Sequence, residues 1–511
     1  MNRKLDLPNL LVFTALMFGI ILRFYPGITN GLPLNDGGMF YIMVQDLKAN
    51  DFRLPEFTTY NHSQIPFVYP PLGFYITALL STLIPGSDLS IFTYLPAFIT
   101  SLCIPAFYLF AKEILPSRLT AALATLLYTF CGTSFVWVVM GGGVTRSLGI
   151  LFLLLMMQQS IQMFRNYQHR HLLLAILFGA GAVTSHPQTA LHAALGGLLI
   201  FLFFGLNKRG VISAIFMGLG VALLSAPWWG TVISQHGLNT LLSAGHSRPR
   251  ELESYLTLFS ADTLKDLNFL PVLLLAIIGT PIAVKQKDFF SIAWVISTVL
   301  IDPLAGGGMT LFLTVTLAAR GFVQVAEWIS RLKDEQVEAV FMRRGSLNLI
   351  FGLMVWLVIT AFISNFQLVN SSLKAEDLKV FAWVRENVKG TKTFLLATGR
   401  DFSLSDPWQE WFPALAGQRS VTTLQGLEWT YGENFFPWYS ELTAFQHCHD
   451  AACVDEWALR NHVEYDYLIV LNPDTADDNT PLKQLGKSVK NSAAFTLIYE
   501  ADNAYIFELK K

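Results

Sequence analysis

Long runs of hydrophobic residues alternate with short polar loops along the first 370 residues of the chain. Eight of these runs match the length of a helix that crosses a bilayer, which needs about 20 apolar residues. They lie at residues 8–25, 92–111, 119–139, 147–164, 188–205, 211–232, 267–284 and 346–366, and shorter or interrupted runs lie at residues 172–184, 289–302 and 309–319. The pattern predicts a mostly α-helical, polytopic membrane protein with about 11 transmembrane helices.

The run at residues 67–84 is also long enough to span the membrane, but Pro70 and Pro71 stand near its start. Positive charge decides its place, because Lys and Arg of short loops collect on the cytoplasmic side. If this run does not span, alternate loops carry fifteen basic residues on one side and seven on the other. We therefore predict a cytoplasmic N-terminus, an outer loop with interfacial helices at residues 26–91, and a C-terminal part that lies outside.

The composition of the chain changes after Asn370. Residues 372–388 have the pattern of an amphipathic helix, and Gly390 stands where a left-handed cap would close it. Short runs rich in β-forming residues follow at residues 393–398, 465–471, 495–499 and 505–509, separated by polar turns. We predict a transmembrane domain at residues 1–370 and a small extracytoplasmic α/β domain at residues 371–511.

The amino-acid composition supports a membrane protein and argues against a protein that binds nucleic acid. Hydrophobic residues make up 53% of the 511 residues and charged residues 14%, whereas roughly a quarter of a soluble protein is charged. The 35 basic and 37 acidic residues balance, so no overall positive field would hold nucleic acid. The first apolar run lacks a small-residue cleavage site after it and is interpreted as a retained span. Among the four cysteines, only Cys448 and Cys453 lie in a polar segment and could pair.

Asp36 is the first candidate for chemistry. It precedes Gly37 and Gly38 in the predicted first outer loop, directly before apolar residues at helical spacing. One interpretation is that its carboxylate caps an interfacial helix, which contributes about 1 kcal/mol. The other is that it acts as a general base at the membrane surface. Spacing alone leaves both interpretations open.

A second candidate is the segment from Gly141 to Arg146, which contains three consecutive glycines. On the predicted topology it begins a helix that runs inward from the outer face. Unpaired N–H groups, bare backbone at Gly143 and the Arg146 guanidinium would suit a phosphate at the level of the lipid headgroups. The alternative is a flexible turn with an arginine that reaches to the interface.

Other residues of the predicted outer face could join such a site. One inward-running span begins after His186 and Pro187, and another after Asp302 and three glycines at residues 306–308. The loop at residues 233–266 adds further basic and acidic residues, of which the arginines could bind a diphosphate with two hydrogen bonds each. A solvated charged face is the alternative for this loop. The further candidates are His62, His186 and His246 as site histidines, with Arg248 and Arg250 as phosphate ligands.

Asp36 at the start of an interfacial helix, Tyr69-Pro70-Pro71-Leu72, and the hydrophobic pattern that follows resemble the GT-C superfamily of membrane glycosyltransferases. The likeness covers roughly residues 8–210 and is greatest to the protein mannosyltransferase and aminoarabinose transferase branch. That family transfers a sugar from a polyprenyl-phosphate carrier to an acceptor outside the membrane, using an outer-loop aspartate that Asp36 matches. Tyr69 stands where many members have a lysine or histidine that meets the phosphate. Arg146 is our candidate replacement, by the helix-terminus argument.

The segment Thr145-Arg146-Ser147 also resembles a stretch of oligosaccharyltransferase catalytic subunits, but the acidic residues expected after it are missing. We therefore assign no metal ligands and no cofactor, although a divalent metal would be compatible with that branch.

The resulting hypothesis is an inverting glycosyltransferase of the plasma or inner membrane, part of the cell envelope. Asp36 would accept the proton of the acceptor hydroxyl, while Arg146, Gly143 and Tyr69 would bind the donor phosphate. The partners would be the membrane, a polyprenyl-phosphate sugar lipid, and a glycan, lipid or protein acceptor. The alternatives are a transporter or lipid flippase, whose site residues would lie near the bilayer midplane, and a GT-C relative without catalytic activity.

The predicted C-terminal domain contains half of the twelve tryptophans of the chain. Exposed tryptophans can stack on sugar faces, whereas in a small domain most tryptophans belong to the core. The hypothesis for acceptor recognition places it at Trp408, Trp411, Trp429 and Trp438.

Overall fold

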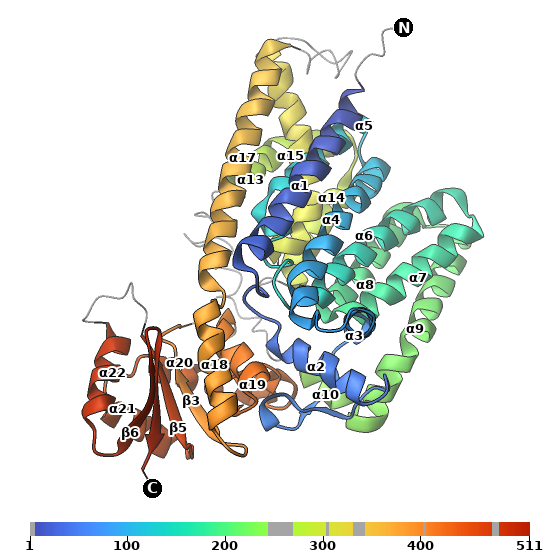
Figure 1. Ribbon diagram of the computed structural model, residues 1–511. Helices are drawn as coiled ribbons and strands as arrows, with labels where there is room; N and C mark the ends of the chain where they lie inside the picture. The colour runs from blue at the N-terminus through green and yellow to red at the C-terminus, as the bar shows by residue number, and fades with distance from the viewer. Residues whose placement is uncertain are drawn as a thin grey trace.

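A computed structural model of the chain describes residues 6–243, 269–302, 306–330, 343–401, 405–472 and 480–510. Its first part consists mainly of helices, which occupy the upper and right parts of Figure 1. They are α1 (Leu7–Asn30), α2 (Gly38–Ala49), α3 (Leu72–Leu83), α4 (Asp88–Ile114), α5 (Arg118–Phe130), α6 (Gly143–Asn166), α7 (His169–Ser185), α8 (Pro187–Phe204), α9 (Lys208–His236), α10 (Leu238–Ser243), α13 (Leu270–Lys285), α14 (Phe289–Ile301), α15 (Gly306–Ser330) and α17 (Arg344–Ser371).

Each of the eleven predicted apolar runs contains a helix in the structure, and residues 267 and 268 of one run lie outside the described residues. Within the described ranges, seven helices are long and apolar enough to cross a membrane, namely α1, α4, α6, α8, α9, α15 and α17. Many large apolar side chains of these helices are exposed, such as Ile212, Phe216 and Leu223 on α9. A surface this apolar is suited to lipid and not to water. The prediction of a mostly α-helical integral membrane protein is therefore confirmed.

Two predicted helix ends are wrong. The run predicted at residues 119–139 stops being α-helical at Phe130, and a 3-10 turn, η2 (Gly132–Ser134), follows. The run predicted at residues 309–319 continues to Ser330, because Arg320 is buried and paired with Asp288 and does not lie in a loop. In the sequence, a charged residue such as Arg320 marks the end of an apolar run. In the folded protein, an arginine that is paired with an aspartate can lie inside a helix.

The outer loop predicted at residues 26–91 contains α2 and α3 together with a small hairpin. The hairpin pairs β1 (Phe57–Thr58) with β2 (Ile65–Pro66) in antiparallel fashion, and η1 (Tyr60–His62) lies between the two strands. α3 has 12 residues and is therefore about 18 Å long, well below the roughly 30 Å of the hydrocarbon core. This length agrees with an interfacial position for the run at residues 67–84.

The C-terminal part contains a five-stranded sheet with helices, at the lower left of Figure 1. Its elements are α18 (Ala375–Asn387), β3 (Thr393–Ala397), α19 (Pro407–Ala416), β4 (Arg419–Ser420), η6 (Leu427–Trp429), η7 (Gly432–Asn434), α20 (Phe435–Gln446), α21 (Ala451–Arg460), β5 (Tyr467–Leu471), α22 (Pro481–Asn491), β6 (Phe495–Ala501) and β7 (Ala504–Leu509). The strand order is β4-β3-β5-β7-β6. The first three strands are parallel, and β5, β7 and β6 are antiparallel.

The four predicted strands correspond to β3, β5, β6 and β7, and the predicted amphipathic helix corresponds to α18. Cys448 and Cys453 form a disulfide, as the sequence suggested. Each face of the sheet has its own hydrophobic cluster: Leu395 and Leu468 belong to one, and Phe394 and Ile469 to the other. Burial on both faces follows from side chains that alternate along each strand. α19 packs against α18 and also against α2 of the outer loop, so it joins the two parts of the chain.

Candidate functional site

Two glycine-rich loops bring Asp36 next to the start of α6. The N–H of Gly141 donates to the carbonyl of Leu34 at 2.9 Å. A Cβ on Gly37 would lie 2.8 Å from the carbonyl carbon of Gly141, and one on Gly141 would lie 2.1 Å from the backbone oxygen of Asp36. Gly37 also has φ of 119°, a conformation that strongly favours glycine. The glycines are therefore needed because the two backbones touch.

The carboxylate of Asp36 forms a bidentate ion pair with Arg146. Nη1 of Arg146 lies 2.8 Å from Oδ2, and Nη2 lies 3.0 Å from Oδ1. The backbone N–H of Gly142 donates to Oδ1 at 2.9 Å. Both side chains are about nine-tenths buried, at 11% and 9% exposure. Planar, charge-assisted pairs of this kind fix geometry as well as contributing energy.

This arrangement shows that Asp36 does not cap the helix that follows it, α2. The N-cap residue of α2 is Gly37, and no side chain caps that helix. The Asp36 carboxylate instead lies at the N-terminus of α6, where the N-cap residue is Gly142. The positive end of the α6 dipole therefore holds an anion, as predicted, but that anion is the protein's own carboxylate.

Arg146 has further capacity beyond this pair. Its Cζ lies 4.4 Å from the centroid of the Trp137 ring, a cation–π distance. Its Nε atom is buried and has no hydrogen-bond partner within the described ranges. A Cβ on Gly142 would lie 2.9 Å from Oδ2 of Asp36 and 3.1 Å from Nη1 of Arg146. Bare backbone at this position is thus required by the ion pair.

Tyr69 lies beside the first turn of α6. The backbone of Val144 and Thr145 approaches Gly73 so closely that a Cβ there would lie 2.6 Å from the carbonyl oxygen of Val144. The Tyr69 hydroxyl interacts with Thr145, and burial raises the pKa of this hydroxyl. The ring packs edge-on against His186 at 6.1 Å and against Trp429 at 6.2 Å. Tyr69, His186 and Trp429 thus lie in the site region, and the positive charge of Arg146 acts on the Tyr69 hydroxyl.

Gly143 is the first residue of α6, and His186 precedes Pro187, the first residue of α8. A Cβ on Gly149 of α6 would lie 3.1 Å from the Cβ of His186, so the start of α8 lies beside the second turn of α6. Gln188 of α8 donates to Asp302 at 3.0 Å, which connects α8 to the end of α14. The shared face predicted for three helix N-termini stays a prediction.

Several predicted residues lie elsewhere. His62 is exposed, and its Nε2 lies 3.2 Å from the carbonyl oxygen of Gly417, at the contact with the C-terminal part. The candidates His246, Arg248 and Arg250 lie outside the described residues. Within the described ranges, no group of three or more His, Cys, Asp or Glu residues could hold a metal ion.

The four candidate tryptophans for sugar stacking have different environments. Trp408 is buried and packs edge-on against Phe381 at 4.6 Å. Trp411 is buried between the two parts of the chain, and Trp438 packs against Trp457 at 6.0 Å. Because a buried ring offers no face to a sugar, the burial of Trp408, Trp411 and Trp429 argues against stacking at these three positions. Trp429 contacts Tyr69 and so reaches the site region, and Trp438, the fourth candidate, is half-buried.

A residue absent from the sequence-based set completes the site. Oε1 of Glu410, on α19, accepts a hydrogen bond of 2.8 Å from the N–H of Gly37. Glu410 is 5% exposed, and burial, followed by the negative charge of Asp36, raises the pKa of its carboxyl to about 8. The preceding Asp406-Pro407 signals the start of a helix, but nothing local in the sequence signals that this helix meets residue 37.

The described residues form a bundle of apolar helices, a segment with two short helices at residues 26–91 and a C-terminal α/β unit, which is the arrangement expected from the resemblance to the GT-C superfamily. No family model and no curated protein sequence matches the chain. Solved structures match it: ArnT from Cupriavidus metallidurans bound to undecaprenyl phosphate has a TM-score of 0.58, 11% identity and 97% coverage of both chains.

Two further structures show the same likeness. The apo oligosaccharyltransferase from Archaeoglobus fulgidus has a TM-score of 0.54 and 13% identity, and the match covers 90% of this chain and 69% of that one. The arabinofuranosyltransferase AftD from mycobacteria has a TM-score of 0.58 and 13% identity, over 97% of this chain and 41% of that one. At these identities the likeness concerns the fold, and it confirms the GT-C-type architecture.

Proposed function

We propose that this protein transfers a sugar from a polyprenyl-phosphate carrier to an acceptor hydroxyl on the extracytoplasmic side of the membrane. The observation that carries the proposal is the ion pair of Asp36 and Arg146 at the N-terminus of α6. It places a carboxylate and a guanidinium, the two groups that such a reaction needs, in one buried site. The fold shared with ArnT, which is solved with undecaprenyl phosphate bound, supports a lipid phosphate as the donor.

The chemical step uses each group once. The acceptor oxygen attacks the anomeric carbon, its proton passes to Asp36, and the bond from that carbon to the phosphate oxygen breaks with its electron pair. The configuration at the anomeric carbon inverts. Arg146 and the positive end of the α6 dipole hold the phosphate as negative charge builds on it, and they accelerate the step only if they bind it more tightly then than in the donor. The N–H groups of Gly142 and Gly143 are already engaged, by Asp36 and by the carbonyl of Met140.

The structure adds a condition to this mechanism. Both terminal nitrogens of Arg146 are already engaged by Asp36, so Asp36 is not yet free to accept a proton. The donor phosphate must draw one or both of these nitrogens away, and the unpaired Nε offers it a first contact. Binding of the donor thereby releases the base, and the base stays neutralised while the site is empty.

Acceptor recognition is proposed at Trp438, the one of the four candidate tryptophans whose ring is not buried. The proposed sidedness places residues 26–91 and the C-terminal part outside and the loop between α6 and α7 inside. The disulfide between Cys448 and Cys453 supports this, since disulfides persist in oxidising compartments.

The decisive test is transfer itself. Purified protein in lipid nanodiscs is incubated with a panel of radiolabelled polyprenyl-phosphate sugars and a membrane extract as acceptor source, and release of free polyprenyl phosphate is measured. Carrier release that depends on the protein and on the acceptor supports the proposal. Movement of intact donor across a vesicle membrane without its consumption would instead identify a flippase.

Sidedness has its own test. Cysteines are introduced singly at Glu56 and at Gln168, which are both exposed. The native thiols give little background, because Cys103 and Cys131 are buried and the other two cysteines form a disulfide. A membrane-impermeant maleimide applied to intact cells should label position 56 and leave position 168 unlabelled. The reverse pattern would contradict the proposed orientation of the site.

A further inference from the structure

Hydrogen bonds from several different groups join α19 to residues 35–60. The N–H of Gly37 donates to Oε1 of Glu410 at 2.8 Å. The indole Nε1–H of Trp411 donates to the backbone oxygen of Asn35 at 2.8 Å. The hydroxyl of Tyr60, in the outer loop, donates to the backbone oxygen of Glu410 at 2.7 Å. The residues on both sides of Asp36 are therefore held by α19.

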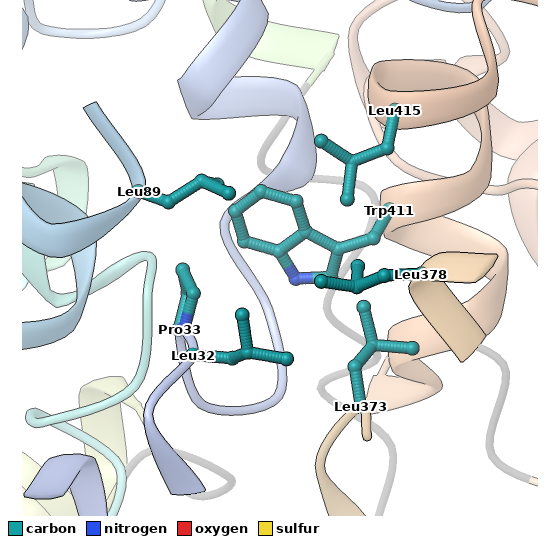
Figure 2. A pocket seen from close by; sticks show the side chains of 7 residues that line it. All are labelled: Leu32, Pro33, Leu89, Leu373, Leu378, Trp411 and Leu415. Atoms are coloured by element: carbon teal, nitrogen blue, oxygen red, sulfur yellow. The ribbon is translucent and has the colours of Figure 1, made fainter. Parts of the chain in front are cut away.

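An apolar layer surrounds these bonds. Figure 2 shows the Trp411 indole between leucines from both parts of the chain, with Leu89 on one side and Leu378 and Leu415 on the other. The ring also packs against Tyr41 at 6.0 Å and Phe92 at 6.4 Å. A Cβ on Gly38 would lie 2.2 Å from the backbone oxygen of Glu410. α19 is thus in direct backbone contact with the start of α2.

We infer that Glu410 is a positioning residue for Asp36, so that the C-terminal domain is an integral part of the transferase site. The inference rests on the proposed function and adds a residue to it. Asp36 must point at the N-terminus of α6 while its neighbour Gly37 has a left-handed φ of 119°. The bond from Gly37 to Glu410 fixes this turn from the side opposite the ion pair.

Charge makes the contact sensitive to protonation. The groups that act on the Glu410 carboxyl are Asp36 and Arg146, and the Tyr60 hydroxyl lies on its backbone oxygen. A neutral Glu410 still accepts the Gly37 N–H through its carbonyl oxygen. An ionised Glu410 brings a second negative charge next to Asp36, and this charge competes for Arg146.

The experiment compares E410Q, E410A and wild-type protein in the carrier-release assay, with donor KM and kcat measured from pH 5.5 to pH 9. Glutamine keeps an oxygen for the Gly37 N–H but does not titrate. We expect E410A to lower kcat by about tenfold or more with donor KM within about threefold, since a misplaced reacting group costs rate. E410Q should restore most of kcat and remove the part of the alkaline pH dependence that Glu410 contributes.

The matched control is Asp377→Asn. Asp377 is also a buried carboxylate of the C-terminal domain, and it accepts a backbone N–H from Lys374 at 2.7 Å. Burial raises its pKa as well, but its recorded partners lie within its own domain. This variant should leave kcat and the pH profile of the transfer reaction unchanged.

The outcomes separate the two proposals. An active wild type in which E410A retains full kcat would overturn the role of Glu410 alone. A wild type that releases no carrier from any donor would overturn the proposed function and this inference with it. If E410A fails to fold, Trp411→Phe takes its place, because it removes the bond to Asn35 and part of the apolar packing around it but leaves the Glu410 side chain intact, and its kcat should fall by about threefold or more. Unchanged kcat in that folded variant would also count against the inference.

Discussion

Among the residues that the structure describes, two arginines form buried ion pairs with aspartates, and the surroundings of the two pairs differ. At the start of α14, Asp288 pairs with Arg320 at 2.6 Å. Asp288 caps its own helix by accepting from the N–H of Ser291. Arg320 also donates to Gln286 and to the carbonyl of Ile114. These groups connect α14, α15 and the end of α4, which is a structural task.

The Asp36–Arg146 pair also joins two elements, the loop before α2 and the start of α6, but its surroundings differ. Asp36 leaves its own helix uncapped, and glycine backbones surround its carboxylate where side chains would block the ion pair. In the part of the chain that the structure describes, each arginine keeps one buried nitrogen without a partner, Nε of Arg146 and Nη1 of Arg320. The bare glycine backbone, and not unused bonding capacity, therefore distinguishes the two pairs. The comparison teaches that the backbone and side chains around an ion pair, and not the ion pair itself, distinguish a candidate active site from a structural contact.

The largest expected effect is a loss of activity in Asp36→Asn that Asp288→Asn does not share. Asp36→Asn should lower carrier release by about 10²-fold or more, the usual contribution of a general base, while the variant still inserts and binds donor lipid. Asp288→Asn should reduce thermal stability and leave turnover per folded molecule unchanged. Equal activity of the Asp36→Asn variant and the wild type in the nanodisc assay would remove the base assignment.

The arginines should separate in the same way, with smaller effects. Arg146→Lys loses the planar bidentate geometry, so we expect kcat to fall by about tenfold, with a change in stability below about 1 kcal/mol. Arg320→Lys should instead cost about 1–3 kcal/mol of stability with normal turnover per folded molecule. Thermal unfolding and kinetics on the same preparations check both. If both variants lose kcat and thermal stability to the same extent, the two ion pairs have the same role.

A third comparison concerns a single methyl group. Gly142→Ala places a Cβ 2.9 Å from Oδ2 of Asp36, so the ion pair must shift, and we expect kcat to fall by about three- to tenfold. Gly218→Ala on α9 meets nothing within 4 Å and should leave turnover intact. If the Gly142→Ala variant keeps its kcat, the close approach of residue 142 to the Asp36–Arg146 ion pair has no kinetic consequence.

The smallest effect is a dependence of stability on pH. Burial raises the pKa of Glu410 from 4.5 to about 8, so the folded protein binds this proton more tightly than the unfolded chain does. The stability from this group is fully present below pH 4.5 and is lost as the pH rises through about 8. Wild-type protein should therefore lose more thermal stability between pH 5 and pH 8.5 than E410Q loses. Parallel melting curves with equal pH slopes would contradict this sign.

The amino-acid sequence by itself determined the apolar helices, the amphipathic helix α18, the four longer strands of the C-terminal sheet and the two cysteines that could pair, but not the helices α19 to α22. Each of these depends on periodicity, composition or spacing within a short stretch, because local backbone preference and burial act over a few residues. The sequence also picked out Asp36 and Arg146 as candidates, from a motif and from a helix-terminus argument. It could not show that the two bind each other across 110 positions.

Only the tertiary structure decided the roles of Gly142, Glu410 and Trp411. Glu410 meets Gly37 across 373 positions, and Trp411 meets Asn35 across 376. No local pattern encodes such contacts, since they depend on how α19 packs on α2. The same reason explains the misjudged end of α15, where Arg320 stays inside a helix because Asp288, distant in sequence, neutralises it. A charged residue is visible in the sequence, but the free energy of burying it depends on the partner that it meets in the folded protein.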